Sequence, residues 1–161
     1  MKRSKYLRKL TWEHQDALQI ARNLDKGLSI DTDLNQVRGY AVNVVENLLE
    51  PHFLVEEQSL VLRLDGANLH QASVVEVMRQ HREFGRLKEK LKCSEESELR
   101  LLLKQFSALL KAHVLLEEQQ FFPFIEQTLS TAQLIQAERE IDAGNIIDCS
   151  NWPDPYWKPK R

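Results

Sequence analysis

Apolar residues recur every three or four positions through most of residues 4–142, and the positions between them are polar or charged. This spacing is typical of amphipathic α-helices, whereas β-strands alternate every second residue. Helix-ending and helix-starting residues separate the amphipathic stretches. We therefore predict four long helices over about residues 4–27, 34–64, 71–93 and 95–123, and a short fifth helix over about residues 131–143.

Individual side chains indicate how these helices begin, bend and end. Ser94 is expected to cap the fourth helix, whose first turn is acidic, and Ser130 is expected to form a capping box with Gln133 at the start of the fifth. Pro51 lies inside the second helix, where it removes a backbone hydrogen bond, so it predicts a kink or a division just before it. Pro123 predicts an end or a bend of the fourth helix.

Long helices with short connections predict an all-α fold, namely an antiparallel up-down four-helix bundle with a short fifth helix and an extended C-terminal arm. We expect the bundle to span residues 1–128, and residues 129–161 to hold the short helix and the arm. The last 18 residues contain three of the five prolines, so they cannot form a regular helix. We expect the aromatic side chains of the arm to pack on the bundle, and docking of a partner or a second subunit is the alternative; these side chains are Trp152, Tyr156 and Trp157.

Composition narrows the class of protein further. The chain has 161 residues, of which 42% are hydrophobic, so it can bury a core. No run approaches the roughly 18–20 apolar residues of a membrane span, and no apolar segment of a signal peptide follows the basic N-terminus, so we expect a cytoplasmic protein without a membrane partner. Residues 10–161 hold 17 basic and 24 acidic side chains, which argues against nucleic acid as a partner. Cys93 and Cys149 lack metal-site spacing.

Four of the five histidines fall one to a predicted long helix, and each lies on the apolar face of its helix: His14, His52, His81 and His113. Counted from the helix ends at about 1.5 Å per residue, they reach the same level of the bundle to within one turn. A buried imidazole needs a hydrogen bond or a metal, because desolvating it unpaired costs about 1–3 kcal/mol. Four histidines in one layer favour a metal over ordinary core packing.

Two of these histidines have a glutamate four residues further on, which places Glu56 beside His52 and Glu117 beside His113. Residues at this spacing project from the same face of a helix, so an imidazole and a carboxylate can reach one metal. The combination suits iron, manganese or zinc, and two facing carboxylates can bridge two metals. Without a metal, the two glutamates would be buried like charges, and one would have to be protonated.

The segments WEHQDAL, HFLVEEQSL, RQHREF and HVLLEEQQFFP resemble the four helical motifs of the hemerythrin-like (HHE cation-binding) domain family. The resemblance covers about residues 5–128, and the repeated H-x3-EE pattern is its most specific part. It implies a non-haem centre of two iron ions with an oxo or hydroxo bridge, manganese or zinc being the alternatives. The implied terminal ligands are His14, His52, His81 and His113, and the implied bridges are Glu56 and Glu117.

One departure from this family changes the expected function. Oxygen-carrying hemerythrins have a further histidine one turn before the third-helix ligand, where this chain has Val77, and His70 is too distant to replace it. The metals would then keep open positions, which Glu57, Glu118 or water can fill. Gly85, one turn beyond His81, either leaves room for a small molecule or permits a close helix–helix contact.

We therefore expect a protein that binds or reacts with O2, NO or a peroxide in sensing, protection or iron handling. It is more a binding protein than an enzyme; if it is an enzyme, it is an oxidoreductase acting on the same molecules. Two alternatives stay open. One is a metal-stabilised interaction module without redox activity, which binds a partner through the basic N-terminus or the C-terminal arm, or forms a homodimer through that arm. The other is a metal-free bundle.

Overall fold

The computed structural model describes residues 4–144, 152–153 and 155–159, and every regular element within these ranges is helical. This confirms the predicted all-helical class. The α-helices are α1 (Arg8–Ser29), α2 (Leu34–Val44), α3 (Glu50–Ser59), α4 (Ala72–Cys93), α5 (Glu96–Leu116), α6 (Phe122–Thr128) and α7 (Thr131–Ala143). No helix among the described residues is both long enough and apolar enough to cross a membrane.

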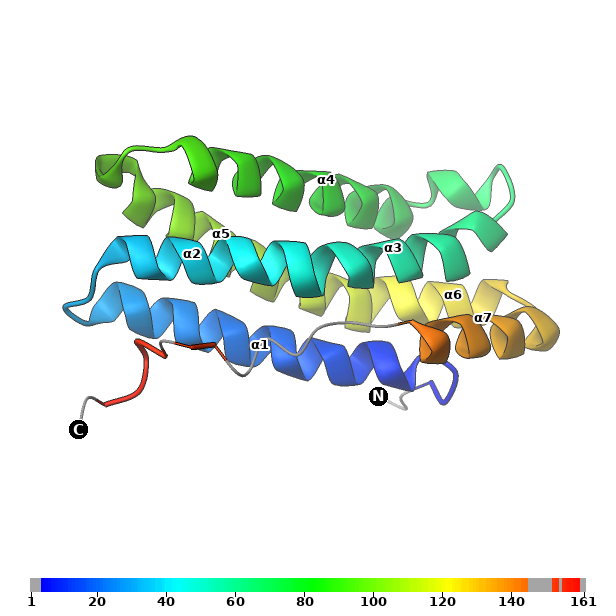
Figure 1. The fold of residues 1–161 in the computed structure, drawn as a ribbon. Coiled ribbons are helices and arrows are strands. Elements are labelled where there is room, and N and C mark those ends of the chain that lie inside the picture. The colour runs from blue at the N-terminus through cyan, green and yellow to red at the C-terminus, as the bar shows by residue number, and fades with distance from the viewer. Residues whose placement is uncertain (1–3, 145–151, 154, 160–161) are drawn as a thin grey trace.

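The long helical segments lie side by side as rods, and the chain connects successive rods at alternating ends of the molecule (Figure 1). The rods are α1, then α2 with α3, then α4, then α5 with α6. The short α7 packs against α3 and α1 at the end of the bundle where α6 finishes. Lys9 secures this helix, because its Nζ donates to the carbonyl oxygens of Ile141 at 3.1 Å and Gly144 at 2.6 Å.

Two rods contain a π-helical turn directly before a proline-bearing segment. In the second rod this turn is η1 (Val45–Leu49), and in the fourth rod it is η4 (Glu117–Phe121). Pro51 and Pro123 then lie in the first turns of α3 and α6, where a missing N–H is tolerated. The division predicted before Pro51 is therefore a π-helical turn, and Pro123 follows a turn of the same kind without ending its rod.

The structure corrects three predicted helix ends. Helix α1 begins at Arg8 and not near Ser4, because the Ser4 hydroxyl accepts the N–H of Tyr6 at 3.1 Å in a local turn. Helix α3 ends at Ser59, and a 3-10 turn η2 (Val61–Arg63) follows it before the connection to α4.

The third correction concerns Ser94, which does not cap α5. The N-cap is Glu95, and the Ser94 hydroxyl instead donates to the carbonyl oxygen of Leu91 at the end of α4. The capping box of Ser130 with Gln133 at the start of α7 is confirmed.

The core consists of two apolar clusters. One fills the bundle between α1, α2, α4 and α5 and includes Tyr40, Phe84 and Phe106. The other lies nearer the α6 end and includes Leu10, Val77 and Phe121, together with side chains of α7. Along each rod, the predicted site residues fall at the border between the two clusters. A polar layer therefore crosses an otherwise apolar core.

The described part of the C-terminal arm lies against α1 and α2. Tyr156 is buried, and its hydroxyl donates to the carbonyl oxygen of Asn23 at 3.1 Å. The rings of Trp152, Tyr156 and Trp157 surround that of Tyr40, with centroids 5.6, 5.8 and 4.8 Å away. We call these four residues the aromatic seat. The arm thus packs its aromatic side chains on the bundle.

Candidate metal centre

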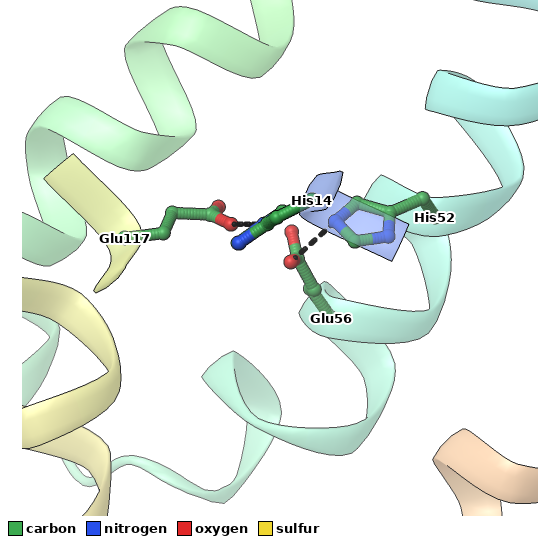
Figure 2. Close-up of side chains that lie close together, drawn as sticks. All are labelled: His14, His52, Glu56 and Glu117. Atoms are coloured by element: carbon green, nitrogen blue, oxygen red, sulfur yellow. Dashed lines mark hydrogen bonds and ion pairs between the residues drawn. The ribbon is translucent and has the colours of Figure 1, made fainter. Parts of the chain in front are cut away.

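The six predicted ligands come together from all four rods, and all are buried, none more than 8% exposed. They form two groups in which one ligand atom of each residue lies within 4.8 Å of the others. The first group, shown in Figure 2, is His14, His52, Glu56 and Glu117. The second is His81, His113, Glu56 and Glu117. The two glutamates therefore belong to both groups, and the cluster is compatible with metal binding.

The Nε2 atoms of all four histidines point to the shared carboxylates. In the His14/His52 half of the centre, Nε2 of His14 lies 2.8 Å from Glu117 Oε2, and Nε2 of His52 lies 2.7 Å from Glu56 Oε1.

The contacts are longer in the His81/His113 half. There Nε2 of His81 lies 3.4 Å from Glu56 Oε2, and Nε2 of His113 lies 3.0 Å from Glu117 Oε1. Helical spacing explains the within-rod pairs: His52 and Glu56 are one turn apart in α3, and Glu117 begins η4 one turn after His113.

The donor atoms of this layer fit a cation. Several ligand atoms of this layer are buried and form no hydrogen bond of suitable geometry in the described part of the chain, although they lie within ion-pair distance of one another: Glu56 Oε1 and Oε2, His81 Nε2, His113 Nε2 and Glu117 Oε1. Buried polar atoms without a well-formed hydrogen bond are costly in a core. A bound divalent cation would accept lone pairs from such atoms, and imidazole nitrogen with carboxylate oxygen is the donor set of iron, manganese and zinc sites.

In the metal-free protein the same residues form a network of opposite charges. Burial alone would lower the pKa of His14, but its contacts with Glu117 and Glu118 raise it to about 9. Burial acts in the same direction on His52, where Glu56 and Glu13 raise the pKa to about 10.

Neighbouring opposite charges also shift the pKa values of His81 and Glu117. Burial opposes the charged form of His81, but contacts with Glu117, Glu56 and Glu57 raise its pKa to about 11. Burial also opposes ionisation of Glu117, and the nearby His113, with contacts from the other histidines, holds its pKa well below the usual range. Metal binding must therefore displace protons from the imidazoles.

A second layer of side chains contacts the Nδ1 atoms of the four histidines. Its members are Glu118 beside His14, Glu13 beside His52, Glu57 beside His81 and Gln80 beside His113. From the sequence, Glu57 and Glu118 are expected only as occupants of open metal positions, and no role is expected for Glu13 or Gln80. The sequence does contain a relevant pattern, because each of the four residues is the immediate neighbour of a predicted ligand. On a helix, such a neighbour points about 100° away and toward an adjacent rod.

Aromatic rings cover two of the histidines. The ring of Phe53 stacks on His81 with centroids 4.0 Å apart, and Phe122 lies parallel to His14 at 5.3 Å. Such rings exclude water and fix the imidazole planes. Val77 is buried in the second apolar cluster, and His70 is exposed at the end of the 3-10 turn η3 (Asn68–His70).

Two cavities lie near the centre. A small one of about 10 Å³ is bounded by His14, His52 and His113 and by apolar side chains that include Leu48 and Leu110. An open groove of about 810 Å³ runs outside between α1 and the α5–α6 rod, and Glu118 lines it.

Gly85 lines neither of these two cavities. A methyl group built at Gly85 would meet no other atom within 4 Å, so the alternative of a close helix–helix contact is wrong.

The chain matches the family model of the Hemerythrin HHE cation binding domain over residues 6–125. No curated protein and no solved structure matches it. The match spans most of the chain and includes all six predicted ligands, so the protein belongs to the hemerythrin HHE cation-binding family. Its buried histidine and glutamate cluster is compatible with metal binding.

Proposed function

We propose that this protein holds two non-haem iron ions and binds or reacts with O2, NO or a peroxide at them. The observation that carries the proposal is the pair of overlapping groups, each with two histidines and the same two buried glutamates. A single structural ion needs only one such group. The duplication supports two ions side by side, and the buried ligand atoms that form no hydrogen bond of suitable geometry support a bound cation.

Each residue then has a defined task. His14 and His52 would hold one ion, and His81 and His113 the other, while Glu56 and Glu117 would hold the pair together. Two ferrous ions would supply electrons to a small bound molecule. The chain would offer two imidazoles to each ion and the two shared carboxylates to both, which would leave room for a further ligand.

The small cavity beside His14, His52 and His113 supports a diatomic or similarly small partner. Its volume of about 10 Å³ is near the lower limit for one water-sized molecule, and its other walls are largely apolar. Apolar walls favour uncharged molecules such as O2 and NO over ions or metabolites. A sensing, protective or iron-handling role matches a buried site of this small size.

The alternation of connections in Figure 1 also supports the antiparallel up-down bundle as the topology that frames this centre. In it, each rod presents one histidine at the same height. The bundle then positions the ligands without using loops, which favours a rigid site.

The alternative function is a helical interaction module stabilised by a structural metal. The open groove of about 810 Å³ between α1 and the α5–α6 rod is the observation that favours it. The aromatic arm does not, since its described aromatic side chains already pack on the bundle.

The first experiment is to measure metal content per chain in protein purified without added metal, and near-ultraviolet absorbance before and after anaerobic reduction. We expect about two irons per chain and absorption bands that bleach on reduction and respond to O2 or NO. One zinc per chain, or no metal and no bands, would contradict the di-iron proposal and favour the interaction module.

A further inference from the structure

The Nδ1 partners of the histidines differ between the two halves of the centre. In the His14/His52 half, both partners are carboxylates. His14 Nδ1–H donates to Glu118 Oε1 at 2.6 Å, and His52 Nδ1–H donates to Glu13 Oε2 at 2.5 Å. Two negative charges therefore support the imidazoles of this half.

The His81/His113 half has only one such charge. His81 Nδ1–H donates to Glu57 Oε1 at 2.8 Å, whereas His113 Nδ1–H donates to the neutral amide oxygen of Gln80, also at 2.8 Å. Gln80 is 6% exposed, so water does not take the place of a carboxylate there.

The orientation of the Gln80 amide is set by its own neighbours. Its Nε2 donates to Glu76 Oε1 at 3.3 Å, and Glu76 is in turn held by the guanidinium of Arg79 at 2.7 Å. The oxygen of the amide therefore faces His113, whose Nδ1 carries a proton and whose Nε2 faces the centre.

A carboxylate that accepts an imidazole N–H makes the opposite nitrogen a stronger metal ligand and adds a favourable charge near the ion. An amide oxygen accepts the same hydrogen bond without the charge. We propose that Gln80 makes the two metal positions unequal, so that a first divalent ion binds in the His14/His52 half and the His81/His113 half is the weaker position. This inference rests on the proposed two-metal function.

The test begins with the wild-type protein, stripped of metal and titrated with Co²⁺ against a chromophoric chelator. We expect two binding events whose dissociation constants differ at least about tenfold. His113→Ala should keep the tighter event, and His52→Ala should keep only the weaker one. Binding of fewer than two Co²⁺ ions by the wild type would overturn the two-metal function itself. Two equal events would overturn only the present inference.

A charge-conserving exchange isolates the role of Gln80. The double variant Glu76→Gln, Gln80→Glu moves one negative charge from position 76 to position 80, and the amide introduced at position 76 can donate to the carboxylate introduced at position 80. We expect the weaker event to tighten by about 10- to 100-fold and the tighter event to change little. Glu76→Gln alone measures the loss of charge at position 76, because its amide oxygen can still accept from Gln80 Nε2; it should tighten the weaker event far less than the double variant does. An unchanged weaker event in the double variant would overturn the proposal.

Glu13→Gln tests the difference between the two metal positions in the His14/His52 half. It removes a charge there and places no new charge in the core. It should weaken the tighter event by about 10- to 100-fold and leave the weaker event unchanged. If circular dichroism shows that the double variant does not fold, Glu13→Gln is the deciding test. The proposal is overturned if Glu13→Gln lowers the Co²⁺ affinity of the weaker event, or if it lowers the affinity of neither event.

Discussion

The candidate metal centre and the aromatic seat are two buried regions of one bundle that are stabilised in opposite ways. In the seat, Tyr156 donates to the backbone of Asn23, and the Asn23 side chain donates to the hydroxyl of Tyr40 at 3.2 Å. In the centre, buried glutamate oxygens face histidine nitrogens at ion-pair distance, and several of these atoms form no hydrogen bond of suitable geometry. The hydrogen bonds of the seat are made without a ligand, whereas the centre is compatible with a bound cation. A substitution in the seat should therefore lower the free energy of unfolding, whereas a substitution in the centre should mainly change metal binding.

The largest expected effect comes from removing a shared carboxylate. Glu56→Ala should reduce the metal content from two ions to at most one, because Glu56 belongs to both groups of ligands. Metal analysis after dialysis measures this directly. Glu46→Ala is a matched control in the same rod, since Glu46 is exposed and pairs with Lys92. Two ions retained in the Glu56 variant would show that the ligand assignment is wrong.

The metal-free protein should lose stability as the pH rises from about 7 to 9. The pKa values of His14, His52 and His81 in the folded state, about 9, 10 and 11, exceed the unfolded value of 6.5. The protonated histidines contribute their full amount to the free energy of unfolding below pH 6.5. This contribution is lost as the pH rises through their pKa values in the folded state. Each histidine that keeps its proton in the folded state lowers the free energy of unfolding as the pH rises through this window, because the unfolded histidine has already lost its proton.

Urea unfolding in the presence of a chelator at several pH values measures this effect. In the metal-loaded protein, the stabilisation by metal should instead increase with pH, because protons compete with the ion for the imidazoles. A metal-free protein that becomes more stable between pH 7 and 9 would contradict the charge network. The Tyr156→Ala variant should show the same pH dependence as the wild type, because the seat lies outside that network.

Tyr156→Ala tests the seat. Removing this buried ring should lower the free energy of unfolding by about 3–5 kcal/mol, the cost usual for a large aromatic residue in a core. Metal content at low temperature should stay at the wild-type value. Loss of metal from a folded Tyr156 variant would show that the two regions are coupled.

The smallest effects come from two helix glycines that differ only in their surroundings. A methyl group at Gly27 would lie 2.5 Å from Cε2 of Tyr156, whereas one at Gly85 would meet nothing within 4 Å. Gly85→Ala should therefore stabilise the protein by about 0.5–1 kcal/mol, and Gly27→Ala should destabilise it by about 1–2 kcal/mol.

The cost of Gly27→Ala should fall when the ring is absent. In the Tyr156→Ala background, Gly27→Ala should be less destabilising than in the wild type, because the 2.5 Å contact with Tyr156 Cε2 is gone and only the 3.0 Å contact with Val37 Cγ2 opposes the higher helix propensity of alanine. Thermal unfolding of the four proteins completes the double-mutant cycle. Equal effects of Gly27→Ala in both backgrounds would show that the arm does not occupy this position in solution.

Much of the centre could be predicted because its pattern is local. The pairs His52–Glu56 and His113–Glu117 need only the periodicity of one helix, and the level of each histidine needs only the distance to a helix end. The connections were harder to predict. Ser94 has the chemistry of an N-cap, but its hydroxyl bonds backward to Leu91, a choice that depends on how α4 ends.

Sequence periodicity by itself determined the all-helical class, the apolar faces and the six residues that meet in the core. Only the tertiary structure decided which Nδ1 partner each histidine has, because Glu13 and Gln80 contact histidines of other rods. It also decided that Tyr156 packs beside Gly27. The physical reason is that helical periodicity specifies directions around a single axis, whereas contacts between rods depend on their relative rotation and height, which the packing of the whole core sets.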